Sequence, residues 1–144
     1  TLYFANESQT GLIAERRVID NVPSNVPIEK VVLQELLKGP KTEGLISTIP
    51  SETDINDVSK EAMTCYVDLN PAFDNRLLAG TSARKLAVYS IVNTLTGLSE
   101  GDVNRVQFLI NAERVAGRNL EIDLSQTFEV DESLIITKTL DDEL

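Results

Sequence analysis

The chain has 144 residues, of which 42% are hydrophobic, and this fits one globular domain with its own core. Its formal net charge of −10 argues against nucleic acid and anionic membrane surfaces, both of which attract basic footprints. With no histidine and one cysteine, the chain cannot form an internal disulfide, a cysteine-based zinc site or a triad with a histidine base.

Short apolar segments open the chain. Leu2–Ala5 and Leu12–Ile19 flank the polar turn cluster Asn6–Gly11, and this pattern predicts a β-hairpin. The charged run Glu15–Arg17 is compatible with a binding site, but we expect a solvated strand edge with cross-strand charge pairs. Because natural proteins seldom begin with a strand, we also expect this sequence to be a domain of a longer chain or a mature form, with upstream sequence missing.

The clearest helix signal follows this hairpin. In Ile28–Leu37 the apolar residues recur at helical spacing, and Glu29 is expected among the polar residues of the remaining surface. Gly39 is placed to adopt a left-handed conformation after the last turn, and Pro40 forbids continuation of the helix.

Residues 41–57 form a long polar excursion after the helix. A loop of that length is uncommon in a compact domain unless it carries structure or function. Leu45 and Ile49 are expected to tether the excursion to the core, and Ile55–Val58 is predicted to be a short strand.

Strict alternation marks the segment Met63–Leu69. Every second residue is apolar, which predicts a half-buried strand with Met63 and Cys65 on its buried face. Cys65 is therefore expected to be a structural cysteine rather than a reactive thiol. Asp68 falls on the opposite face, where we expect a solvated carboxylate.

The second half of the chain repeats the helix–strand pattern. Thr81–Thr96 is predicted to be a helix that starts with a Thr-Ser N-cap and stops at Gly97. Val103–Ile110 alternates as a strand, and Leu120–Leu124 shows a weaker alternation. The apolar run Leu134–Ile136 fits either an edge strand or a docked tail.

These elements predict a single α+β domain. Its order is an N-terminal β-hairpin followed by α-β-β-α-β, with two helices packed on one face of a small sheet. We place the domain at residues 1–125 and treat residues 126–144 as a C-terminal extension with an added edge strand and an acidic tail.

Candidate chemistry is sparse. Asp68 and Asp74 could offer oxygen ligands to a cation such as Ca²⁺, or an acid/base pair, but we expect a solvated turn. Ser82 and Lys85 have the spacing of a serine–lysine pair, without the flanking residues that such an acyl enzyme needs. We therefore expect no enzymatic activity, no metal and no cofactor.

Five stretches carry a family resemblance. They are Leu2–Phe4 with Leu12–Arg17, Leu36–Pro40 with Gly44–Leu45 and Ile49–Pro50, Tyr66–Asn70 with Phe73, Ile91–Thr96, and Val103–Ile110. In order and spacing over residues 2–125, they resemble the GerM (germane) domain of bacterial sporulation and cell-envelope lipoproteins. The residues that match its motifs, all expected to be structural, are Gly39, Pro40, Gly44, Leu45, Pro50, Asp68, Asn93, Thr94, Leu95 and Thr96. The chain departs from the family at Asn111–Ala112, where an Asp-Gly turn is common.

The resemblance implies a non-catalytic, extracytoplasmic interaction module whose fold is similar to the ring-building motifs of secretion-type assemblies. It implies membrane attachment in the full-length protein through a lipid or a single span, and protein partners in the cell envelope or a second copy of the chain. The alternatives are a ligand- or cation-binding lipoprotein domain and a carboxylate-based hydrolase. For partner binding, we look first to residues 41–57 and an exposed strand edge.

Overall fold

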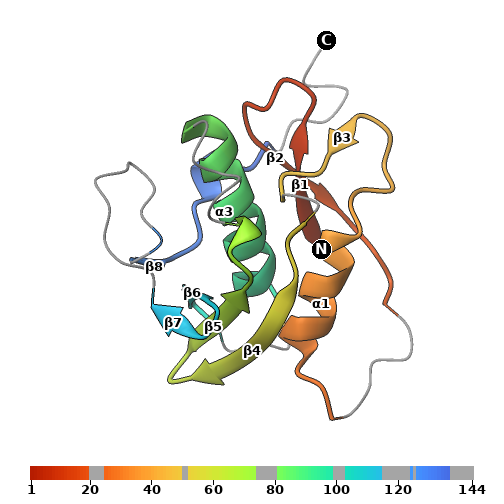
Figure 1. Ribbon diagram of the computed structural model, residues 1–144. Helices are drawn as coiled ribbons and strands as arrows, with labels where there is room; N and C mark the ends of the chain where they lie inside the picture. The colour runs from red at the N-terminus through yellow and green to blue at the C-terminus, as the bar shows by residue number, and fades with distance from the viewer. Residues whose placement is uncertain are drawn as a thin grey trace.

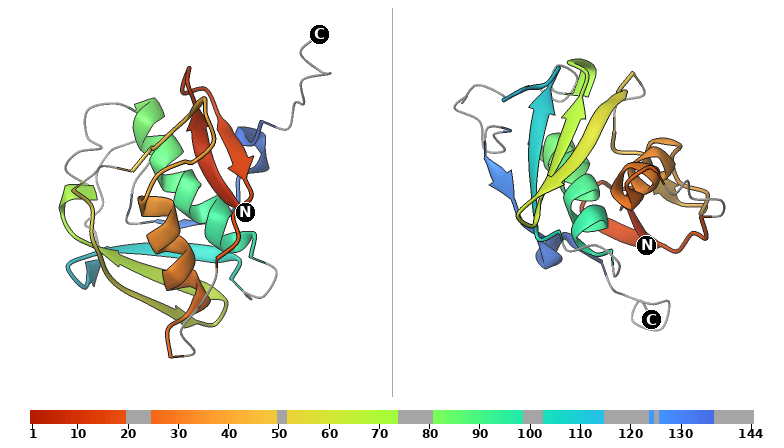
Figure 2. Two further views of the ribbon diagram at one scale, coloured as in Figure 1. Left: turned by 90° about the vertical axis from the view of Figure 1, so that its right-hand side faces the viewer. Right: turned by 90° about the horizontal axis from the view of Figure 1, so that it is seen from below.

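The computed structural model describes residues 1–19, 25–49, 52–73, 81–98, 103–114, 124 and 126–136. These residues form one compact α+β domain with two sheets (Figure 1). Helix α3 (Thr81–Thr96) lies between the sheets, and helix α1 (Ile28–Leu37) packs beside it (Figure 2). The predicted fold class is confirmed.

The smaller sheet confirms the predicted hairpin. Strands β1 (Leu2–Asn6) and β2 (Leu12–Glu15) pair antiparallel, and β3 (Leu45–Ile46) joins the other edge of β1. The excursion after α1 is therefore tethered by β3 and by the buried Ile49, as expected. The prediction of a strand as far as Ile19 is wrong, because the chain leaves the sheet after Glu15 to bind the end of α1.

The larger sheet has the order β4-β5-β6-β7, with β8 also paired to β6. Its strands are β4 (Ile55–Glu61), β5 (Thr64–Leu69), β6 (Arg105–Ile110), β7 (Glu113–Arg114) and β8 (Thr127–Phe128). β4 and β5 form a hairpin, whereas β5 and β6 run parallel because α3 carries the chain back across the sheet. Both helices pack on the same face of this sheet, as predicted.

Helix α3 is buried on more than one side because a sheet lies on each side of it. Ile91, Val92 and Leu95 are fully buried, and so are the polar residues Ser90 and Thr94. The main core joins α1, α3, β1 and the larger sheet, with aliphatic side chains and the stacked pair of Phe73 and Phe108. Most of the core is aliphatic, as the low aromatic content of the sequence indicated.

The predicted end of α1 is confirmed. The helix stops at Leu37, and Gly39 adopts a φ of 90°, a left-handed conformation that favours glycine. The Gly39 N–H donates to the Leu36 carbonyl at 3.1 Å, which satisfies a carbonyl in the last turn.

Two side chains differ in burial from what the sequence pattern predicted: one expected to be buried is exposed, and one expected to be exposed is buried. Met63 is 50% exposed and sits with Ala62 in a two-residue turn, both with positive φ, so it is not on the buried face of β5. Neither residue is glycine, and the turn has no sequence signal of the usual kind. Glu29 is 0% exposed, because its position on α1 faces the larger sheet rather than solvent.

The C-terminal residues pack on both sheets. Phe128 of β8 is buried against the core, and the chain then forms a short 3₁₀ turn, Glu132–Leu134. Residues 134–136 dock on β2 through a single bridge between Ile135 and Leu12. Of the two predicted arrangements, an edge strand or a docked tail, the structure shows the docked tail. Leu120–Asp123 lie outside the described residues, and the domain boundary at residue 125 stays a prediction.

Candidate functional site

Asp68 lies on the sheet face that points away from the helices, as predicted, but only 8% of it is exposed. Its Oδ1 accepts hydrogen bonds from the backbone N–H of Ala112 at 2.9 Å and from the Asn56 amide at 3.4 Å. The expectation of a solvated carboxylate is therefore wrong, because Asp68 accepts a backbone hydrogen bond from the β6–β7 turn.

The β6–β7 turn explains why a carboxylate is needed there. Asn111 and Ala112 have φ values of 50° and 67°, the left-handed conformations of a type I′ hairpin turn. Alanine adopts this conformation less readily than glycine does. The hydrogen bond from the Ala112 N–H to Asp68 holds the turn in the position where an Asp-Gly sequence was expected.

The cation and serine–lysine alternatives rest on residues outside the described part of the chain. Asp74 and the Ser82 side chain are not among the described residues. Within the described residues, no three His, Cys, Asp or Glu side chains are grouped so that they could hold a metal ion. Both alternatives stay predictions.

Cys65 is fully buried on β5. Burial and the nearby Glu29 carboxylate raise the pKa of the Cys65 thiol to about 12. The thiol is therefore protonated at neutral pH, which agrees with a structural cysteine rather than a nucleophile.

Two of the motif residues on α3 bind the ends of the described chain to this helix. The Asn93 amide donates to the Asp131 carbonyl at 3.1 Å and accepts from the Asp131 N–H at 3.0 Å. The Thr94 hydroxyl accepts from the Tyr3 N–H at 3.1 Å, and the Ser90 hydroxyl donates to the Tyr3 carbonyl at 2.5 Å. The hydroxyl groups bind the backbone of Tyr3, where β3 no longer pairs with β1, and this explains the polar residues in a buried helix.

Gly39 lies at the C-terminal end of α1, close to the ion pair of Arg17 with the carboxylate of Glu15. Glu15 is 5% exposed, and its Oε1 accepts the backbone N–H groups of Lys41 at 2.8 Å and Thr42 at 2.7 Å. Gly44 follows with a φ of 89° and leads into β3. Glu15 thus organises the loop after α1, and the prediction that it is solvated is wrong.

Arg17 completes this junction, with a side chain that is 4% exposed. It forms an ion pair with Glu15 and donates to the carbonyl oxygens of Glu35 and Gly39, each at 3.0 Å. Arg17 therefore caps the C-terminal end of α1, where unpaired carbonyls and the helix dipole favour a cation.

The junction determines the ionisation of Glu15. Burial opposes ionisation, but the hydrogen bonds from Thr42, Lys41 and Arg17 outweigh it and lower the pKa of Glu15 to about 2. The sequence pattern did place Glu15 and Arg17 on one strand face. Their partners lie far along the chain, so the pattern could not show that this face is covered.

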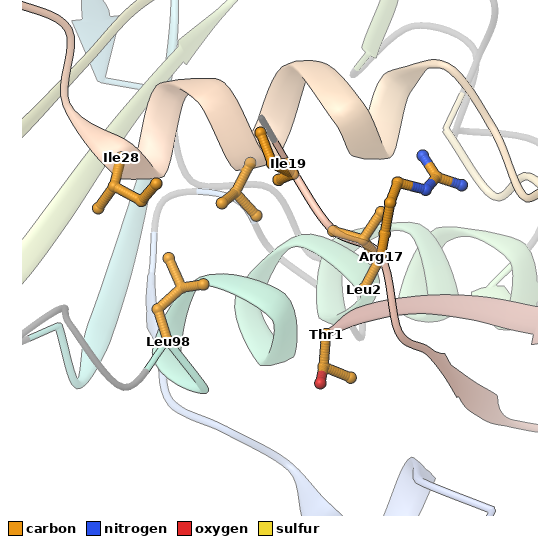
Figure 3. Close-up of a pocket in the computed structure, with 7 residues that line it drawn as sticks. Thr1, Leu2, Arg17, Ile19, Ile28 and Leu98 are labelled. Atoms are coloured by element: carbon orange, nitrogen blue, oxygen red, sulfur yellow. The ribbon is translucent and has the colours of Figure 1, made fainter. Parts of the chain in front are cut away.

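A small pocket of about 200 Å³ opens beside the first residues (Figure 3). It is lined by Thr1, Leu2, Arg17, Ile19, Ile28, Val32 and Leu98. Figure 3 shows the aliphatic stem of Arg17 at the pocket and its guanidinium turned away from it. The pocket therefore offers apolar contact and no directed charge.

β4 is an edge strand of the larger sheet. β5 pairs with one side of β4, and no described strand pairs with the other side. Asp57, Ser59 and Glu61 are exposed and stand opposite Asp68, Tyr66 and Thr64 of β5, so they share its outer face. We call Ile55–Glu61 the β4 edge.

Lys60 points from the β4 edge toward the core instead. Its Nζ lies 3.2 Å from Oε2 of Glu29, which is fully buried. The pairing register is also interrupted by a bulge between Ile55 and Asp57. An inward-pointing charge and a β-bulge both limit the pairing of an exposed strand edge with strands of other molecules.

The motif residues as a set lie in different parts of the fold. Gly39 and Pro40 lie at the Glu15 junction, whereas Gly44 and Leu45 lead into β3 beside Asn6. Asp68 supports the β6–β7 turn, and Asn93–Thr96 lie on α3. Leu95 is fully buried, and the Thr96 hydroxyl donates to the Val92 carbonyl at 2.8 Å. Pro50 lies outside the described residues. Their structural role is compatible with these contacts and stays a prediction.

The sequence model of the Germane family matches residues 1–121, and the description of this family is sporulation and spore germination. The tandem GerMN domains of the sporulation protein GerM from Bacillus subtilis align with a TM-score of 0.69 and 21% identity. That match covers 89% of this chain and 44% of the tandem chain, so the present chain spans less than half of it. The first GerMN domain alone gives a TM-score of 0.55 at 21% identity, covering 82% of this chain and 86% of that domain.

A candidate lipoprotein from Clostridium perfringens is also similar, with a TM-score of 0.63 and 16% identity over 95% of this chain and 91% of that one. At these identities, the structural matches show a shared fold. The sequence matches none of the curated proteins with which it was compared. Among the described residues, no helix combines the length and the apolar character needed to cross a membrane.

Proposed function

The chain belongs to the Germane family, and on this premise we propose that it is a non-catalytic interaction module of the bacterial cell envelope. The family description and the lipoprotein-like neighbour support a sporulation- or envelope-associated role. The proposal places the module outside the cytoplasm, attached to the membrane in the full-length protein by a lipid or a single span. Its partner is another protein of the envelope.

The open β4 edge is the observation that carries this proposal. An unpaired strand edge presents main-chain donors and acceptors to which an extended segment of a partner can add as a further strand. Two of the reactive side chains that the sequence contains have structural surroundings. Asp68 holds a turn, and the Cys65 thiol is buried.

The charges on the β4 edge define the partner strand. Asp57 and Glu61 lie four residues apart on the outer face, with Ser59 between them. Residues directly opposite each other in a sheet share a face, and opposite charges in such pairs stabilise it. We therefore expect a partner strand with lysine or arginine at two positions four residues apart.

The same charges disfavour pairing of β4 with β4 of a second copy. A two-fold pairing centred on Ser59 would place Asp57 opposite Glu61 twice, and one centred on Lys60 would place that lysine opposite itself. Like charges directly opposite each other are destabilising. A pairing centred on Val58 would run into the bulge at Asn56. A different protein is the better partner for this edge.

Site-specific crosslinking in the native cells tests the proposal. A photoreactive residue replaces Ser59 on the β4 edge of the full-length protein, and a control protein carries it at the exposed Gln9 in the β1–β2 turn. We expect a discrete adduct from position 59 that contains a second envelope protein and is absent from position 9. Asp57→Lys combined with Glu61→Lys should reduce this adduct at least about fivefold, because both charge pairs become repulsive.

Two results would overturn this assignment of the edge. One is equal crosslinking at positions 59 and 9, or none at position 59. The other is an adduct that persists at full yield after both charge reversals, while circular dichroism shows that the variant is folded.

A further inference from the structure

The second strand edge of interest belongs to β2, and residues of the same chain cover it. Asp131–Ile136, which we call the strap, crosses this edge beside the β1–β2 hairpin (Figure 2). The Ile136 N–H donates to the Leu12 carbonyl at 2.7 Å, and Ile135 pairs with Leu12 in the parallel sense. The strap lies beyond residue 121, where the family match ends.

Three kinds of contact hold the strap. The paired hydrogen bonds between the Asn93 side chain and the Asp131 backbone fix its start. Leu134 packs on the small cluster of Ala5, Leu12 and Leu86. The backbone hydrogen bond of Ile136 fixes its end. Every one of these contacts joins the strap to the rest of the domain.

Gly11 shows how closely the strap approaches. A Cβ atom at Gly11 would lie 2.8 Å from side-chain atoms of Ile136 and 2.8 Å from the Leu134 carbonyl oxygen. Glycine is therefore required for the strap to reach β2, which indicates a shaped seat rather than a loosely apposed tail.

The strap is linked to the core by a short exposed connection. Phe128 is buried and packs edge-on against Phe108 and Tyr89. Glu129 and Val130 then run exposed, with Val130 at 45%, before Asn93 binds Asp131. The strap itself is only partly buried, so its release exposes little apolar area and requires few contacts to break.

We propose that the strap exchanges between two copies of this chain, so that each copy seats its residues 131–136 on the β2 edge of the other. Reciprocal exchange reproduces every strap contact across the two copies, and only the connection at 129–130 changes its path. The β2 edge recognises the strap by the 3₁₀ turn after Asp131 and by the side chains of Leu134, Ile135 and Ile136. This self-association surface is separate from the β4 edge.

Charge repulsion opposes the exchanged dimer, so the amount of dimer should depend on the salt concentration. Each copy carries a net charge of −10, so two copies repel each other, and salt screens this repulsion. The fraction of dimer should therefore rise with ionic strength as well as with protein concentration.

Crosslinking between isotopically distinct copies tests the exchange. An unlabelled full chain carries a photoreactive residue in place of Ile136 and is mixed with a ¹⁵N-labelled chain of natural sequence. We expect adducts between position 136 of the unlabelled copy and the labelled peptide that contains Leu12, together with a dimer in sedimentation velocity. Both should increase with salt. If all Leu12 adducts form within one copy at every concentration and salt, the proposal is overturned.

A pair of variants on α3 separates the seat from general loosening of the fold. Asn93→Ala removes both hydrogen bonds to Asp131 and should speed the mixing of labelled and unlabelled straps by roughly tenfold. Thr96→Ala, three residues along the same helix, loses only the bond to Val92 and should leave the rate unchanged. Equal rates in the two variants would contradict the role of Asn93. Asp57→Lys with Glu61→Lys should not affect exchange, so failure at the β4 edge is distinguishable from failure here.

Discussion

β4 and β2 each have an outer edge, and the two edges are protected in different ways. β4 keeps its edge open over seven residues, with Asp57 and Glu61 on one face and Lys60 turned inward to Glu29. β2 has four residues, and the strap covers its edge by placing Ile135 beside Leu12. The charges on β4 leave its edge accessible but favour some partner strands over others. The edge of β2 becomes accessible only when the strap moves away from it.

This difference has a physical consequence for how each edge can be opened. Lys60 of the β4 edge pairs with the fully buried Glu29, so this edge should respond to the loss of one charge. The β2 edge depends on close contact and hydrogen bonds, so it should respond to added volume and lost acceptors. Changes at one edge should leave the other largely unaffected, since the two lie on different sheets.

The largest effect is expected for Lys60→Ala at the β4 edge. It leaves the fully buried Glu29 without its cation and should lower the free energy of unfolding by roughly 2–4 kcal/mol, measured by urea denaturation. Lys41→Ala, an exposed lysine in the loop after α1, should cost less than about 0.5 kcal/mol.

A double substitution sharpens this result. Glu29→Leu with Lys60→Leu removes both charges and should restore most of the lost stability, since apolar replacements of a buried ion pair are often neutral or stabilising. It also removes the inward charge from β4, so light scattering should reveal more self-association than in the natural chain. A monomeric double variant would show that Lys60 does not protect this edge.

Acid should weaken the β2 side through Glu15, where this strand ends. Its folded pKa of about 2 lies below the ordinary value of 4.5, so its ionised form stabilises the fold above pH 4.5. That stability is lost as the pH falls from 4.5 toward 2, at a cost of roughly 1–3 kcal/mol. Thermal unfolding across this range should show a flatter pH dependence in Glu15→Gln than in the natural chain, with the exposed Glu7→Gln as the control.

Gly11→Ala should open the β2 edge by adding volume under the strap. The Leu134 carbonyl and Ile136 must move away from the new methyl group, which should lower stability by about 1–2 kcal/mol. Hydrogen exchange followed by mass spectrometry should show faster exchange in the peptide that contains Ile136. The peptides of β5 should keep their protection, and a uniform change in both would contradict a local effect.

The smallest expected effect is on the thiol of Cys65, which serves as a reporter for the β4 side. Because its pKa is raised to about 12 and it is fully buried, it should not react with a maleimide in the native chain at neutral pH. Lys60 lies directly opposite Cys65 in the β4–β5 pairing. Loss of the Lys60 charge would raise the pKa of the thiol further, so faster labelling in Lys60→Ala would have to come from a loosened β4–β5 pairing, which we expect from its lower stability. Gly11→Ala should leave the labelling rate unchanged.

Local patterns predicted much of the fold. The hairpin, the helix Ile28–Leu37 with its stop at Gly39, and the helix ending at Thr96 are confirmed. The Ala62–Met63 turn was missed because it uses left-handed conformations without glycine or asparagine. The α-β-β-α-β order, together with the stretches that resemble the family, was sufficient to predict the fold class and the Germane relationship.

Local patterns did not predict which charged residues are buried. Glu15, Glu29 and Asp68 were expected to be solvated, and all are buried. Polarity predicts solvent exposure unless a partner compensates for the cost of burial. The partners of Glu15 come from the loop after α1, that of Glu29 from β4, and those of Asp68 from β4 and the β6–β7 turn.

By itself, the sequence determined where both helices and most of the longer strands form, because helix periodicity, alternation and the Gly39-Pro40 stop act over a few residues. Only the tertiary structure decided which strand edges remain open. The state of an edge depends on segments that the chain brings together from far apart, such as Lys60 beside Glu29 and the strap beside Leu12. Those contacts have no local signature, since each residue would be equally compatible with solvent until its partner is in place.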